Sequence, residues 1–179
     1  MVSRCTSTRR KGIAFVTYAG ILVAFCASIT VSVVADAVQD CQQKKDLKLQ
    51  VQGCTQLLSR SLAPAGQAAV YQYRGSAYLG LGQYDSAIDD LTKSINIQAD
   101  ALTYTLRGGA YEAKHRYDLA IPDFNAAIQL KPDLAELYLY RGVCLLAKGD
   151  TSDSIADFKV VINKKPELPD GLLHEGAGE

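Results

Sequence analysis

Small and aromatic residues recur at helical spacing in the middle of the chain. In the first segment that shows this, they occupy Tyr71, Gly75, Tyr78, Ala87, Leu91, Ser94 and Ile95. Steps of three and four residues place each set on one face of a helix and leave the other face polar. Residues 80–83, Gly-Leu-Gly-Gln, separate the two sets and are typical of a turn. The pattern predicts two amphipathic helices joined by a short connection.

This two-helix pattern occurs three times. The motif Tyr71-x-x-Arg74-Gly75-x-x-Tyr78 recurs as Tyr104-x-x-Arg107-Gly108-x-x-Tyr111 and again as Tyr138-x-x-Arg141-Gly142-x-x-Leu145, with offsets of 33 and 34 residues. A period of that length indicates a repeat array, in which each unit buries its apolar face against its neighbour. The units are expected at residues 68–100, 101–134 and 135–168.

The register of the repeat continues through the second helix of each unit. Its defining positions are Tyr71, Gly75, Tyr78 and Ala87 in the first unit, Tyr104, Gly108, Tyr111, Ala120, Phe124 and Pro132 in the second, and Tyr138, Gly142, Phe158 and Pro166 in the third. Proline cannot continue a helix and is expected to end the second helices; Pro122 is expected near the start of its own helix. This pattern resembles the tetratricopeptide repeat, a helix–turn–helix unit. The resemblance implies an all-α solenoid of three units.

Two columns of the repeat predict specific contacts. Glycine costs about 1 kcal/mol inside a helix, so its recurrence predicts a helix approach too close for a side chain at Gly75, Gly108 and Gly142. Arginine precedes aspartate by 16 residues in each unit, at Arg74 and Asp90, Arg107 and Asp123, and Arg141 and Asp157. The arginines could form a basic ladder for an acidic ligand. Pairing with the aspartates between packed helices is favoured, because a charge on a packed face requires a partner.

Residues 38–67 resemble a degenerate helical hairpin in front of the first unit. Val51, Cys54 and Leu58 match the second-helix positions of the repeat, and Cys41 falls in the column of Tyr78. Because these two columns pack together in such a hairpin, the resemblance predicts a Cys41–Cys54 disulfide worth about 3 kcal/mol. Two small buried thiols are the alternative. Cys144 is expected to be a buried, small apolar residue.

The first 37 residues have the character of a targeting segment. Four basic residues precede an uncharged, mainly apolar run at residues 12–35, and Ala35-Asp36-Ala37 offers a cleavage site before Val38. The run is also long enough to remain as a membrane anchor. In either case the repeats are expected outside the membrane, so the hypothesis is an exported protein of bacterial type. It would be periplasmic, or anchored in the inner membrane with its repeats on the periplasmic side.

Charge and residue inventory limit the function further. The whole chain balances 19 basic against 19 acidic residues, and without residues 1–37 it carries a net charge of −3. No basic patch remains, so nucleic acid is not an expected partner. The two histidines, His115 and His174, lie in a turn and in the tail at residues 169–179. No catalytic, metal-binding or cofactor-binding constellation is expected, and the chain is not expected to be an enzyme.

The geometry of the family implies a concave binding face on the first helices. Its candidate residues are Gln72, Ser76, Leu79, Thr105, Gly109, Glu112, Leu139, Val143 and Leu146. Such a face would accept an extended segment or an amphipathic helix. Some family members grip a ligand's terminal carboxylates with a Lys/Asn/Arg clamp, which these positions do not show.

The expected function is therefore a non-catalytic adaptor or scaffold that binds a protein or peptide of unknown identity. A structural subunit of a self-associating envelope complex, and thus a homo-oligomer, is the alternative, with a regulatory partner of an enzyme as a third hypothesis. The outer face of the helix expected at residues 151–164 is either a contact for such a partner or is covered by residues 167–174.

Overall fold

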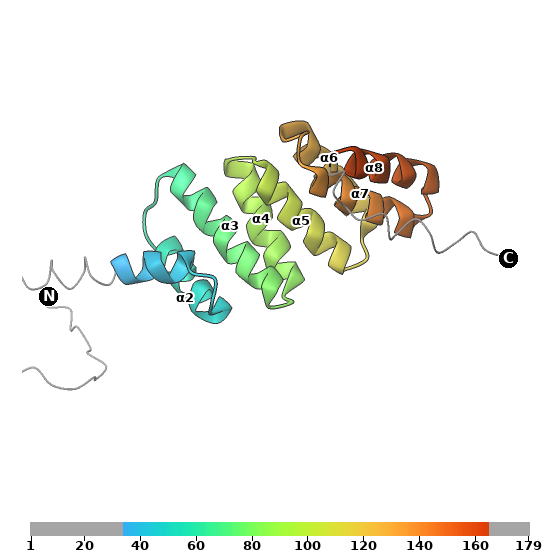
Figure 1. Ribbon diagram of the computed structural model, residues 1–179. Coiled ribbons are helices and arrows are strands. Elements are labelled where there is room, and N and C mark those ends of the chain that lie inside the picture. Colours follow the sequence, from blue (N-terminus) through green and yellow to red (C-terminus); the bar gives the residue numbers. More distant parts are fainter. Residues whose placement is uncertain (1–33, 165–179) are drawn as a thin grey trace, which may run out of the picture. The chain divides into compact units, whose positions relative to one another are not determined.

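The computed structural model describes residues 34–164, which belong to one compact unit. Residues 34–42 are helical and precede seven helices (Figure 1). These are α2 (Leu47–Leu58), α3 (Pro64–Gly80), α4 (Tyr84–Ile97), α5 (Ala101–Ala113), α6 (Tyr117–Leu130), α7 (Ala135–Lys148) and α8 (Thr151–Lys164). The described residues contain no strand, and the fold is all-α as predicted. The tail expected at residues 169–179 and Pro166 lie outside them, as does the targeting segment except for residues 34–37.

The helices pack as three hairpins in chain order. Helices α3 and α4, α5 and α6, and α7 and α8 form the most extensive contacts, and each hairpin then contacts the next. The first helices also touch one another, α3 with α5 and α5 with α7, whereas no such contact joins second helices within the described residues. Helices α3, α5 and α7 therefore form a continuous surface, which we call the first-helix face.

The turn inside each hairpin has the same backbone conformation. One residue of each turn adopts a positive φ, which is 71° at Gly82, 56° at His115 and 96° at Gly149. The next residue donates its N–H to a carbonyl five positions earlier, for example Arg116 to Tyr111 at 2.9 Å, which closes the end of the helix. His115 therefore occupies a glycine-type turn position, as predicted.

Pro122 does not lie where the sequence indicated. It is the sixth residue of α6, not part of the first turn, so the hydrogen bond that its N–H would make to the carbonyl of Asp118 is missing. Both residues are exposed, and water can therefore satisfy that carbonyl.

The glycine column lies where the two helices of each hairpin meet, as predicted. A Cβ atom at Gly75 would lie 2.8 Å from Cγ of Leu91, and one at Gly142 would lie 2.8 Å from Cε1 of Phe158. At Gly108 the Cβ would lie 2.9 Å from Cε1 of Phe124, whose side chain is fully buried. The helices are thus closer together than any larger residue allows.

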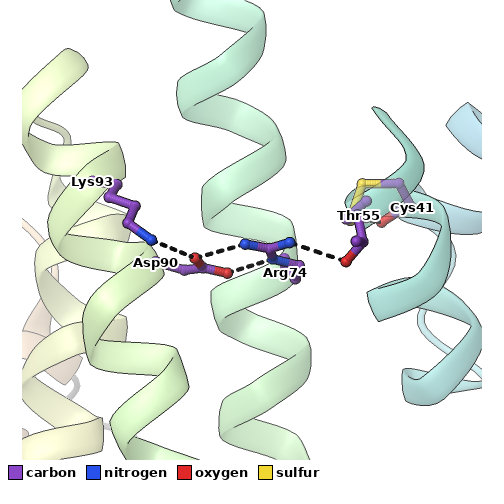
Figure 2. Close-up of polar contacts among 6 residues, drawn as sticks. Cys41, Thr55, Arg74, Asp90 and Lys93 are labelled. Atoms are coloured by element: carbon purple, nitrogen blue, oxygen red, sulfur yellow. Dashed lines mark hydrogen bonds and ion pairs between the residues drawn. A yellow bond between two sulfur atoms is a disulfide. The ribbon is translucent and has the colours of Figure 1, made fainter. Parts of the chain in front are cut away.

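Each repeat arginine is paired, which confirms the structural interpretation of that column. Arg74 donates from Nε and Nη2 to both carboxylate oxygens of Asp90, at 2.6 and 2.9 Å, and from Nη1 to Thr55 Oγ1 at 3.0 Å. Figure 2 shows this guanidinium lying between α4 and α2. Arg107 and Arg141 make the same pairs with Asp123 and Asp157. In every case the hydrogen bond to the aspartate is the largest cause of a raised arginine pKa.

The N-terminal hairpin, formed by residues 34–42 and α2, carries a disulfide between Cys41 and Cys54. Both sulfurs are buried with Ala37, Leu57 and Val70. The two helical segments approach so closely that a Cβ at Gly53 would lie 2.8 Å from the amide nitrogen of Cys41. The cysteine pair occupies the columns that hold Tyr78 and Leu91 in the first repeat and Tyr111 and Phe124 in the second.

We expect Gly108 and Gly109, neighbours in α5, to respond to alanine in opposite directions. Gly108→Ala should lower the free energy of unfolding by about 1–3 kcal/mol, because the buried Phe124 ring cannot move aside. Gly109→Ala should raise it by about 0.5–1 kcal/mol, since a Cβ there meets nothing within 4 Å and alanine favours the helix. Urea unfolding of both variants checks this; equal stabilities would contradict the close-approach explanation.

The disulfide gives a second expectation. In denaturant without reductant, a thiol reagent should label Cys144 but neither Cys41 nor Cys54. Reduction should then expose both and lower the free energy of unfolding by about 3 kcal/mol. A Cys41→Ser/Cys54→Ser variant is the control, because its stability should not respond to reductant. Labelling of Cys41 or Cys54 before reduction, read by peptide mass, would contradict the bond.

Candidate protein-binding face

The nine residues predicted to line a binding face lie on three neighbouring helices of the first-helix face. Helix α3 carries Gln72, Ser76 and Leu79, α5 carries Thr105, Gly109 and Glu112, and α7 carries Leu139, Val143 and Leu146. Spacings of three and four residues put each trio on one side of its helix. The residues of α3 and α5 are half-buried, whereas those of α7 are exposed.

The α3 side of this face is polar, and its side chains serve the fold. Gln72 Nε2 donates to Thr103 Oγ1 at 2.6 Å and to Asp100 Oδ2 at 3.1 Å. Asp100 also caps α5 by accepting from the backbone N–H groups of Leu102 and Thr103. Thr105 donates its hydroxyl to the carbonyl of Ala101. Gln72 therefore links α3 to α5, and both its Nε2 group and the Thr105 hydroxyl already make hydrogen bonds.

A shallow hollow of about 320 Å³ opens beside Gln72. Its lining includes Ala69, Asp100, Leu102 and Lys131. Leu102 is 55% exposed and was missed by the sequence interpretation, although it precedes Thr105 by three residues and so shares its stripe. The hollow offers alanine and leucine side chains and one cation, Lys131, at the edge of the face.

The α7 side is apolar. Leu139, Val143 and Leu146 are 41%, 40% and 51% exposed and form a stripe along the helix. A partner that covers these side chains removes their apolar area from water, and this stabilises the complex by about 25 cal/mol per Å² of area buried. The stripe is therefore the part of the face best suited to anchor a ligand.

Glu112 of α5 occupies the repeat position that Leu146 occupies in α7. Burial raises the pKa of its carboxyl group above the ordinary value, and no cation contacts that group within the described part of the chain. Burial also raises the pKa of the Cys144 thiol to about 12, with the negative charge of Glu112 as a second cause. Glu112 of α5 thus lies near α7, and Cys144 stays protonated at neutral pH.

The nine predicted positions offer no basic residue to a ligand, because none of them is lysine or arginine. The three repeat arginines bind their aspartates, and Lys114 pairs with Asp85. The nine positions therefore offer the apolar side chains of α7 and the partly buried carboxylate of Glu112, with no cation among them.

Residues 34–164 contain no group of three or more His, Cys, Asp or Glu side chains placed to hold a metal ion. None of their helices is both long and apolar enough to cross a membrane.

Solved structures share this arrangement. The first tetratricopeptide-repeat domain of Spaghetti (RPAP3), bound to the HSP90 peptide SRMEEVD, is 27% identical with a TM-score of 0.56; the match covers 57% of this chain and 82% of that one. The second such domain of human RPAP3, in complex with the HSP70 peptide SGPTIEEVD, is also 27% identical, with a TM-score of 0.57 and coverages of 62% and 93%. MamA, at 20% identity, matches 83% of this chain and 88% of its own with a TM-score of 0.70, which shows a shared fold.

Family models agree with these structures, although no curated protein sequence matches the chain significantly. One tetratricopeptide-repeat model matches residues 68–100 and a second matches residues 105–169. Together they span more than half of the chain and include the Arg-Gly pair of each of the three motifs. The chain therefore belongs to the tetratricopeptide-repeat family.

Proposed function

We propose that this protein is a non-catalytic adaptor that binds a segment of another protein on its first-helix face. The observation that carries the proposal is the exposed stripe of Leu139, Val143 and Leu146, which lies beside Glu112. An amphipathic helix or extended segment can cover such a stripe with apolar anchors. The peptide complexes of the two RPAP3 domains support a peptide-binding role.

The chemistry of the face selects a different segment from the peptides of those complexes. SRMEEVD and SGPTIEEVD each have three acidic residues among their last four, whereas the nine positions of the face include Glu112 and no lysine or arginine. Burial disfavours the charged form of Glu112, and a basic residue of a ligand would restore it. The ligand we propose therefore has two or three large apolar residues and a lysine or arginine beside them.

We further propose that the protein is exported, with residues 12–35 acting as a cleaved signal or as an inner-membrane anchor. Cleavage before Val38 would divide the helical segment at residues 34–42 and remove Ala37, which is buried against Cys41 and Cys54. Retention of residues 1–37 leaves that contact intact. The mass of the protein recovered from cells distinguishes the two: a chain that starts at Val38 is cleaved, and one that starts at Met1 is anchored.

The binding proposal is tested with peptides selected from a random library on the immobilised protein. Selected sequences should combine leucine, isoleucine or phenylalanine with lysine or arginine, and SRMEEVD should not bind. Leu146→Ser should weaken a selected peptide about tenfold or more, as the loss of one buried apolar anchor requires. Leu130→Ser, a change at an equally exposed leucine of α6, is the matched control and should leave affinity unchanged. Acidic selected sequences, or equal effects of both variants, would contradict the proposal.

The pH dependence of binding tests the role of Glu112. Because burial raises the pKa of its carboxyl group, Glu112 gains its charge at a higher pH than an ordinary glutamate. The affinity for a lysine-bearing peptide should therefore rise with pH through that titration and stay high above it. Glu112→Gln should remove this rise and weaken binding about fivefold at neutral pH. A titration by fluorescence anisotropy measures both; the same pH profile in the variant would rule out Glu112.

A further inference from the structure

Helix α8 exposes an apolar stripe whose counterparts on the other second helices are covered by the next hairpin. In α4 the stripe contains Ile88 and Ile95, in α6 Ile121 and Ile128, and in α8 Ile155 and Ile162. The first four isoleucines are half-buried because the next hairpin packs on them. Ile155 and Ile162 are each 47% exposed. Helix α8 thus presents the surface on which another first helix would fit.

The centre of this stripe receives a specific group inside the array. A polar side chain lies between the two apolar positions and accepts a hydrogen bond from the arginine of the following helix. The three acceptors are Thr55 for Arg74 at 3.0 Å, Thr92 for Arg107 at 3.1 Å and Asn125 for Arg141 at 2.6 Å. Figure 2 shows the first of these contacts, between Thr55 and Arg74.

In α8 the central position is Lys159. An ammonium group donates hydrogen bonds and cannot accept one, so it would repel an arginine placed opposite. A second copy of the chain is disfavoured for a related reason. Lys159 lies between Ile155 and Ile162, so antiparallel packing of two α8 helices would bring two lysines together at the centre of the contact. The stripe instead calls for a helix that carries a carboxylate among apolar residues.

The sequence after α8 supplies that combination in the register of the repeat. At an offset of 34 residues, Pro132 corresponds to Pro166, Tyr138 to Leu172, Arg141 to Glu175 and Gly142 to Gly176. Pro169 corresponds to Ala135, the first residue of α7, where proline is favoured. Glutamate thus replaces arginine in the same unit in which lysine replaces the acceptor. The charge is reversed on both sides of one predicted contact.

We propose that residues 168–176 dock on α8 as the first helix of a fourth unit, with Glu175 paired to Lys159. Leu172 then takes the place of the repeat tyrosine and covers Ile155 and Ile162. Gly171 stands where α7 has the buried Leu137, so this helix has fewer apolar contacts than α7 has. The docked segment covers the exposed stripe of α8 and leaves the first-helix face free. This proposal is therefore independent of the proposed function.

Hydrogen exchange on the full chain tests the pairing by charge reversal. In the wild type, amides of residues 172–176 should exchange more slowly than in an unstructured chain. Lys159→Glu and Glu175→Lys should each speed this exchange about two- to fivefold, as expected for an exposed ion pair. The double variant should return it to the wild-type rate. Glu167→Lys is the matched control: it makes the same charge change at the position of Asp133, whose side chain is 98% exposed, and should have no effect.

Three results would overturn the proposal. The first is unstructured-chain exchange of residues 172–176 in the wild type. The second is a double variant that exchanges as fast as the single variants, because then no pair is restored. The third is protection of α8 that increases with protein concentration, because then a second copy covers the stripe.

Discussion

The guanidinium of each repeat arginine joins three helices, and the register of the array depends on its being fully paired. A charge that is largely removed from water is costly unless its hydrogen bonds are satisfied. Arg107 meets this condition with Asp123 in its own hairpin and Thr92 in the preceding one. Because the aspartate fixes the hairpin and the acceptor fixes its neighbour, a slip of either helix would leave the cation unpaired.

The glycine column makes this pairing possible. Gly108 follows Arg107 directly and removes the side chain that would otherwise separate α5 from α6. The backbones can then approach until the arginine reaches both oxygens of Asp123. The cost of glycine in a helix is offset by a packed Phe124 ring and a satisfied ion pair.

The arginine and glycine columns use one side of each first helix for packing, so the opposite side is left for binding. Its polar part is used by the fold, because Gln72 and Asp100 link α3 to α5. Its apolar part on α7 is uncovered within residues 34–164. The same reasoning applies at α8, where the repeat has no successor among the described residues and Ile155 and Ile162 stay exposed. Both surfaces follow from a solenoid in which each unit can satisfy only its neighbours.

The sequence by itself determined the class of fold, the threefold recurrence of a two-helix unit and the partners of the repeat arginines and glycines. It could do so because these features recur at a fixed period. A column of small residues or paired charges therefore indicates the same helix contact in every unit. It also placed Cys41 and Cys54 in facing columns.

Only the tertiary structure decided which side chains remain available. It showed that Gln72 is occupied by Thr103, that Glu112 lies near Cys144 and that Leu102 is exposed beside the hollow. It also placed Pro122 inside α6. These outcomes depend on how neighbouring hairpins are turned toward one another, and residues that differ from unit to unit carry no periodic signal of that orientation.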